Sequence, residues 1–187
     1  MSAALRELLD THAPADATEA GDIARLRLLL AEPVDPWARR QPLHCTGSAL
    51  VLHPPTRRVL LRWHENLGRF LHVGGHGDPG EVDPYAVALR EAREETGLVD
   101  LRPFPGVVPA LVQVAIVPVP ARPQEPEAHE HADFRYLLAT DRPAEAVPEK
   151  ASAVLRWCTV PEALAEIGGD RLADCVRRAA ALFDPAR

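Results

Sequence analysis

The chain has few cysteines, and their spacing does not suit disulfide bonds. Cys45, Cys158 and Cys175 are the three cysteines among 187 residues, and no two of them form a CxxC pair. An odd number of widely separated cysteines is not a disulfide framework, and such frameworks belong to oxidising compartments. We therefore expect a protein of a reducing compartment, the cytoplasm.

Long apolar stretches and a surplus of basic residues are also missing. The apolar runs are far shorter than the roughly 18 residues that indicate a membrane span. The N-terminal segment is acidic and lacks the charged-then-apolar layout of a signal peptide. A formal net charge of −6 argues against non-specific binding of duplex nucleic acid. We expect neither membrane nor duplex nucleic acid as a partner. A small anionic substrate is still compatible with the net charge, because a bound metal ion can reverse the local electrostatic field.

The composition is that of a globular protein. Hydrophobic residues make up 47% of the chain and charged residues 26%, so a core of ordinary size can form. The length favours one domain with at most a terminal appendage. Apolar residues recur at helical intervals in 2–12 and 18–32, and prolines follow. We predict an N-terminal helical extension over residues 1–40 and a main domain over residues 41–187.

Beyond residue 40 the hydrophobic period changes to that of strands. Strands are predicted at 48–53, 57–64, 68–73, 106–120, 133–140 and 153–159. Residues 121–132 are polar and proline-rich and predict a loop. Helices are predicted at 84–96, after the capping box of Thr159 and Glu162, and from residue 170 onward. Strands that precede and follow a central helix along the chain predict an α+β fold. We expect an α/β/α sandwich with a mixed central sheet.

The central predicted helix carries a crowd of acids. Asp83 and Pro84 suit its N-cap and first turn, and Gly97 suits its end. At about 100° per residue, Glu91, Glu94 and Glu95 share one side of this helix. Three like charges destabilise a helix unless something neutralises them, and a hard cation with oxygen ligands, such as Mg²⁺, does so. A solvated acidic surface is the alternative interpretation.

A glycine-rich segment leads directly into this helix. Gly74, Gly75, Gly77 and Gly80 precede it. Glycines allow backbone conformations closed to other residues and bring amides and carbonyls close to a ligand. Their presence favours a metal and phosphate site over a solvated surface.

The segment GGHGDPGEVDPYAVALREAREETGL resembles the Nudix box, placed at residues 75–98. The first part of the motif is matched by Gly75 and Glu81. The second part is matched by Arg90, Glu91, Ala92, Glu94, Glu95, Gly97 and Leu98. One departure is that eight residues, rather than the family's seven, separate Glu81 from Arg90. We assign Val82 as the insertion, in the loop before the helix, which leaves the place of Glu81 open and allows Asp78 to share its role.

The resemblance implies a Nudix-type fold and a hydrolase that cleaves a diphosphate linkage in a nucleoside diphosphate joined to another group. It implies Mg²⁺ as the cofactor, with Mn²⁺ as a substitute, and Glu94 and Glu95 as the central metal ligands. The carbonyl of Gly74 would support them, and Glu81 would be an auxiliary ligand. Glu91 would ligate the metal or act as the base, held by its neighbour Arg90.

Residues outside the predicted helix are candidates for contact with the substrate. Glu130 is a candidate base or metal ligand, with a solvated loop as the alternative. The candidates for substrate binding are His72, Gly75, His76, His129 and His131. For His72, a structural role is an equal alternative.

Two other functions stay open. Isopentenyl diphosphate isomerases share the fold and carry a Cys-Gly-His segment at the start of the box, whereas Gly74, Gly75 and His76 stand here and no thiol is present. A Nudix-like nucleotide sensor would have a degenerate box, whereas this one keeps every helical carboxylate. The N-terminal helices either pack on the domain or form a homodimer. The substrate is equally open among nucleotide sugars, dinucleoside polyphosphates, oxidised nucleotides and ADP-ribose.

Overall fold

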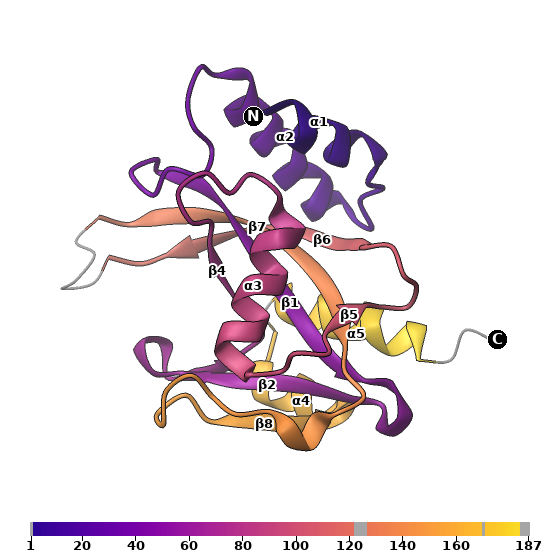
Figure 1. The fold of residues 1–187 in the computed structure, drawn as a ribbon. Coiled ribbons are helices and arrows are strands. Elements are labelled where there is room, and N and C mark those ends of the chain that lie inside the picture. The colour runs from indigo at the N-terminus through magenta and orange to yellow at the C-terminus, as the bar shows by residue number, and fades with distance from the viewer. Residues whose placement is uncertain (1, 122–126, 170, 184–187) are drawn as a thin grey trace.

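A mixed β-sheet forms the centre of the molecule, and helices cover both of its faces (Figure 1). The computed structural model describes residues 2–121, 127–169 and 171–183. In these residues the strands are β1 (Leu43–His53), β2 (Arg58–His64), β3 (Arg69–Leu71), β4 (Val73–His76), β5 (Arg102–Pro103), β6 (Leu111–Val119), β7 (His129–Ala139) and β8 (Leu155–Thr159). The α-helices are α1 (Ser2–Thr11), α2 (Ala17–Ala31), α3 (Pro84–Thr96), α4 (Val160–Ile167) and α5 (Arg171–Leu182). This arrangement confirms the predicted α/β/α sandwich.

The parallel pair of β1 and β7 is the axis of the sheet. Its register runs from Leu43 opposite Glu130 to Leu52 opposite Ala139. Strand β1 also pairs antiparallel with β2 and β4, and β7 pairs antiparallel with β5 and β6. Strands β3 and β8 pair with β2. Strand β4 is antiparallel to β1, and β7 is parallel to it. The end of β4 therefore lies beside the starts of β1 and β7, at one end of these strands.

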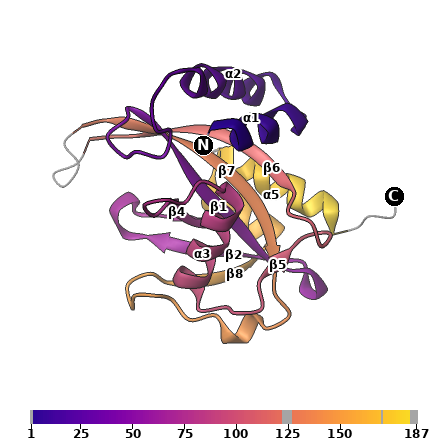
Figure 2. The same cartoon turned by 45° about the horizontal axis from the view of Figure 1, so that its top comes forward.

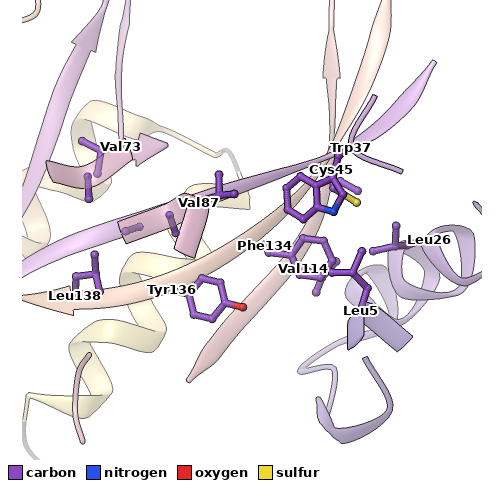
Figure 3. Close-up of a cluster of buried hydrophobic side chains, with 14 of the residues drawn as sticks. Leu5, Leu26, Trp37, Cys45, Val73, Val87, Val114, Phe134, Tyr136 and Leu138 are labelled. Atoms are coloured by element: carbon purple, nitrogen blue, oxygen red, sulfur yellow. The ribbon is translucent and has the colours of Figure 1, made fainter. Parts of the chain in front are cut away.

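Each face of the sheet carries its own apolar cluster. Helix α3 buries Val87, Ala88 and Ala92 against one face, in a cluster with Phe134 of β7 (Figure 3). Helices α4 and α5 cover the other face, where Cys175 and other apolar side chains of α5 are buried. Burying a side chain such as Val or Phe contributes about 1.5–3 kcal/mol. Helix α3, with its acids, is therefore fixed against β1 and β4.

The N-terminal helices lie over β6 (Figures 1 and 2). Leu5 of α1 and Leu26 of α2 join the same apolar cluster as α3 (Figure 3). Helix α2 also binds the backbone of β6 on the side that faces away from β7. Glu19 of α2 accepts a 2.8 Å hydrogen bond from the amide of Val114. The predicted boundary between residues 40 and 41 stays a prediction, although these contacts show that the two helices pack on the sheet.

Local signals set the ends of α3 and α4 as predicted. The Asp83 side chain accepts from the amide of Tyr85, and Gly97 ends α3 with a φ of +67°. That left-handed conformation favours glycine. The capping box of Thr159 and Glu162 is present at the start of α4.

Several strand boundaries differ from the sequence predictions. The predicted loop over residues 121–132 is wrong at its end, where His129 to Ala132 begin β7; its residues 122–126 lie outside the described residues. The strand predicted at 106–120 is β6, which covers only Leu111–Val119. Strand β1 begins at Leu43 instead of 48, and residues 74–76, which were not predicted as strand, form β4 with Val73. These segments are polar or rich in glycine, and only pairing with distant strands makes them extended.

The described part of the chain has no helix with the length and apolar character needed to cross a membrane. The three cysteines are free and buried.

Candidate active site

Arg90 binds the acids that surround it on α3 and on the preceding loop. Its guanidinium donates to Glu81 at 2.9 Å, to Glu91 at 3.1 Å and to Glu94 at 2.9 Å. It also donates to the carbonyl oxygen of His76 at 2.8 Å. The hydrogen bond from Arg90 lowers the pKa of Glu81 despite some burial. The extra residue before α3 therefore leaves Glu81 within this group.

Glu91 lies directly against the backbone of β4. A β-carbon at Gly75 would lie 2.6 Å from Oε1 of Glu91, so any other residue there would displace this carboxylate. The side chain of Glu91 is 17% exposed. Burial raises its pKa, although the Arg90 guanidinium acts in the opposite direction. Loss of water around this carboxylate thus makes its charge costly in the absence of a cation.

Glu95 is the more deeply placed of the two acids. Its Oε2 accepts from the amide of Gly74 at 3.1 Å, and its Oε1 lies 3.3 Å from Nη1 of Arg62. Burial nevertheless raises the pKa of Glu95 to about 7, against the influence of Arg62 and of the Gly74 amide. Arg62 was not among the predicted site residues.

Glu94 completes the acidic face of α3. Its side chain is 53% exposed and its carboxylate is bound by Arg90. Together with Glu91 and Glu95 it provides only oxygen donors within one helical turn, and hard cations such as Mg²⁺ prefer such donors. The backbone of Gly75 lies close to Glu91, with no side chain between this carboxylate and the main chain of β4. The donors of α3 are therefore of the type that a divalent cation binds.

A cavity of about 640 Å³ lies on the other side of the β4 backbone from these acids, none of which lines it. Gly74 and Gly75 form part of its wall and at the same time contact the carboxylates of α3. Other lining residues include Ser48, His72, His76, His131, Asp133 and Arg135. A cavity of this size suits a small-molecule ligand.

Asp133 organises the polar floor of the cavity. Its carboxylate accepts from Thr46 at 3.0 Å, from the Ser48 hydroxyl, from Arg135 at 2.8 Å and from His72 at 3.1 Å. Burial alone would raise the pKa of Asp133, but its contacts with His72 and Arg135 hold it well below the usual range. The hydrogen bond between His72 and this buried carboxylate therefore fixes His72 at the cavity wall.

Glu130 lies apart from the other predicted catalytic residues. Its carboxylate binds the guanidinium of Arg25 on α2, with one contact of 3.2 Å. Because side chains alternate along a strand, it projects from the opposite face of β7 to His129 and His131. A role for Glu130 as base stays a prediction, and its contact with Arg25 places it with α2 instead of the cavity.

The other predicted histidines gather near one end of the cavity. His76 and His131 line it, with their ring centroids 4.8 Å apart, and His129 lies beside His131. Burial and the neighbouring His131 lower the pKa of His76 to about 3. His44, which was not predicted, completes this group, with its ring centroid 5.1 Å from that of His76.

The sequence contains a signal for Asp133 and Arg135, two polar cavity residues that were not predicted as site residues. Positions 129, 131, 133 and 135 are all polar and alternate with mostly apolar residues from 132 onward. Alternation of this kind indicates a strand with one polar face. Arg62 and His44 carry no comparable signal, because their roles depend on contacts with residues far along the chain.

Comparison with solved structures places the fold among Nudix hydrolases. The chain is similar to an Ap4A hydrolase of C. elegans, with 15% identity, a TM-score of 0.58, and 76% of this chain and 98% of that one covered. It is similar to a NUDIX family hydrolase of Clostridium perfringens, with 22% identity, a TM-score of 0.52, and coverage of 75% and 96%. It is also similar to the E. coli dihydroneopterin triphosphate pyrophosphohydrolase, with 16% identity, a TM-score of 0.54, and coverage of 74% and 94%. At these identities the likeness concerns the fold.

A family model described as NUDIX domain matches residues 44–179. The chain belongs to this family, which confirms the resemblance found in its box. Membership and the shared fold support the prediction of an enzyme, a pyrophosphohydrolase. A comparison with curated protein sequences gives no significant match.

Proposed function

We propose that the chain hydrolyses a diphosphate linkage in a nucleoside diphosphate joined to another group, with Mg²⁺ held by the acids of α3. One observation supports this most strongly. Glu91 and Glu95 lie partly buried against Gly75 and Gly74, where burial raises the pKa of both carboxylates. A cation bound between these carboxylates would stabilise their charged form and so offset the cost of burying them.

The proposed ligands are the three acids of α3, Glu91, Glu94 and Glu95. Glu81 is an auxiliary ligand, and the carbonyl of Gly74 supports the set. When bound, Mg²⁺ neutralises the diphosphate, activates a water molecule and stabilises charge on the leaving oxygen. Mn²⁺ accepts the same oxygen ligands and substitutes for it.

Glu91 is the proposed base if the ion is held by Glu94 and Glu95 and leaves the Glu91 carboxylate unbound. Burial then raises its pKa, and a base works best when its pKa approaches the working pH. Arg90 orients it through the 3.1 Å hydrogen bond and simultaneously connects it with Glu81 and Glu94. Glu130 remains a second candidate base, but it would first have to leave Arg25.

The cavity beside β4 is the proposed place for the group attached to the diphosphate. Gly74 and Gly75 lie between the α3 acids and the cavity and carry no side chain, so we propose that the diphosphate passes beside this backbone to reach the acids. His72 and His76 are the proposed contacts for the substrate on the cavity side. The free, buried cysteines support the proposal that the enzyme works in the reducing cytoplasm.

A panel of substrates tests the proposal. Nucleotide sugars, Ap4A, oxidised nucleotides and ADP-ribose are incubated with the full chain and Mg²⁺ or Mn²⁺, and the products are separated by chromatography. At least one compound should be cleaved at its diphosphate, and EDTA should abolish the cleavage.

Two variants serve as controls in this assay. Glu95→Gln should be inactive, whereas Glu7→Gln, an exposed position of α1, should behave as wild type. Nucleotide binding by calorimetry without any metal-dependent cleavage would overturn the proposal and favour a sensor.

A further inference from the structure

Four histidines from three strands meet at one edge of the central sheet. His44 lies at the start of β1, His76 at the end of β4, and His129 and His131 at the start of β7. The register of β1 and β7 sets His44 opposite His131, with ring centroids 4.9 Å apart. The ring of His129 lies 5.2 Å from that of His44 and 5.0 Å from that of His131. We call these four residues the histidine cluster.

Backbone carbonyls orient two rings of the cluster. Nδ1 of His44 lies 2.9 Å from the carbonyl oxygen of Gln41, and Nδ1 of His129 lies 3.1 Å from that of Glu127. A carbonyl oxygen only accepts, so each Nδ1 carries the proton and each neutral ring has an unprotonated Nε2. Histidines that bind metal in proteins are held in the same way, with the second ring nitrogen donating to a carbonyl or carboxylate.

The unprotonated nitrogens point into the cluster. Nε2 of His44 is 3.1 Å from Nε2 of His76, and Nε2 of His129 is 3.2 Å from Nε2 of His131. One ligand nitrogen from each of His44, His129 and His131 lies within 4.8 Å of the other two. At Zn–N bonds of about 2.0–2.1 Å, neighbouring nitrogens of a tetrahedral site are about 3.3 Å apart. Small side-chain rotations are therefore enough to bring three nitrogens onto one ion.

The cluster is separate from the acids of α3. Gly75 approaches Glu91 on one face of β4, whereas the next residue, His76, projects from the other face. His76 and His131 both line the cavity. The donors also differ in kind, since the cluster offers only nitrogen and α3 offers only carboxylate oxygen.

We propose that His44, His129 and His131 bind one Zn²⁺ or a similar transition-metal ion. Imidazole suits Zn²⁺, Cu²⁺ and Ni²⁺, whereas Mg²⁺ prefers oxygen, so the two sites select different metals. The bound ion ties the start of β1 to the start of β7, next to the cavity that His131 lines. This inference does not depend on the proposed hydrolysis.

Calorimetry on the untagged full chain tests the site. The protein is stripped with a chelator, supplied with excess Mg²⁺ to occupy oxygen sites, and titrated with Zn²⁺. Wild type should bind one Zn²⁺ per chain, and the double variant His129→Gln/His131→Gln should bind it at least about tenfold more weakly. Equal Zn²⁺ binding by the two proteins would overturn the proposal.

Two single variants separate the site from its alternatives. His53→Gln removes a histidine at the opposite end of β1 and should leave Zn²⁺ binding unchanged. Glu95→Gln should also keep it, although it disables the proposed Mg²⁺ site. Loss of Zn²⁺ binding in Glu95→Gln would place the ion on α3 and refute the histidine site.

X-ray absorption on Zn²⁺-loaded wild type tests the ligands without any substitution. The spectrum should show a first shell dominated by imidazole nitrogen at about 2.0–2.1 Å. A first shell dominated by oxygen would contradict the proposal, even if the double variant failed to fold.

Discussion

The backbone of Gly75 lies against the carboxylate of Glu91 so closely that a β-carbon at position 75 would be 2.6 Å from Oε1. This contact joins two parts of the Nudix box that are separate in sequence, the glycine segment on β4 and the acids on α3. It also explains why a glycine occupies the middle of a strand, where it is otherwise unfavourable.

Gly75→Ala should therefore reduce activity by displacing Glu91. A shift of about 1 Å in a catalytic group can lower the rate about 100-fold. Gly21→Ala is the matched control, because a β-carbon there meets nothing within 4 Å. Steady-state kinetics with Mg²⁺ should show a large loss of kcat/KM for the first variant and none for the second. Equal rates would show that the position of Glu91 does not matter.

Arg90→Lys should reduce kcat/KM by about tenfold or more, because a lysine ammonium lacks the planar fork that donates to several acceptors. Arg90 donates to Glu81, Glu91, Glu94 and the carbonyl of His76. Arg93→Lys, an exposed position of the same helix, is the control and should retain full activity. An Arg90→Lys enzyme with wild-type kinetics would refute the orienting role.

Metal-free protein should lose stability as the pH rises from about 4.5 to about 7. The pKa of Glu95 is raised by burial from 4.5 to about 7, so the folded state holds a proton that the unfolded chain releases. The stabilisation is complete below pH 4.5 and is lost as the pH approaches the folded value. Glu95→Gln should remove this pH dependence. At pH 8 its free energy of unfolding should exceed that of wild type by about 2–3 kcal/mol.

Urea unfolding in EDTA at pH 5 and pH 8 measures this effect. Glu7→Gln is the control, and its pH dependence should match that of wild type. An identical pH dependence in Glu95→Gln and wild type would show that Glu95 ionises normally in the folded protein.

The packing of α2 on β6 gives a prediction about stability alone. Glu19 is fully buried and accepts from the amide of Val114, while His12 and Arg178 lie within 2.9 Å of its carboxylate. Glu19→Ala leaves these donors without their acceptor and should destabilise the fold by about 2–4 kcal/mol. Urea unfolding at pH 7 measures the loss, with Glu7→Ala as the exposed control on α1. Equal stability of the two variants would contradict the account.

Stability from Glu19 should also disappear in acid. Burial alone would raise its pKa, but hydrogen bonds, first of all with His12, lower it to about 2. A lowered pKa adds stability above the unfolded value near 4.5, and this stability is lost as the pH falls towards 2. The difference between wild type and Glu19→Ala should therefore shrink between pH 4.5 and pH 2.

The sequence predicts the elements whose ends are encoded locally. Helix α3 has the predicted bounds because Asp83 and Gly97 act on adjacent backbone, and the box that it carries is contiguous. The starts of β1 and β7 could not be predicted in this way, since their polar residues become extended only by pairing across the chain. The hydrogen bond from Val114 to Glu19, which joins residues far apart in sequence, likewise has no local signal.

The central claim is that the acids of α3 hold a divalent ion against a diphosphate, and Glu94→Gln tests it most directly. Glu94 is 53% exposed, so its substitution should leave the fold intact or slightly more stable. Turnover of the best substrate with Mg²⁺ should fall by about 100-fold or more, with unchanged thermal unfolding of the metal-free protein as the check on folding. A Glu94→Gln enzyme with wild-type turnover would contradict the assignment of this helix as the metal site.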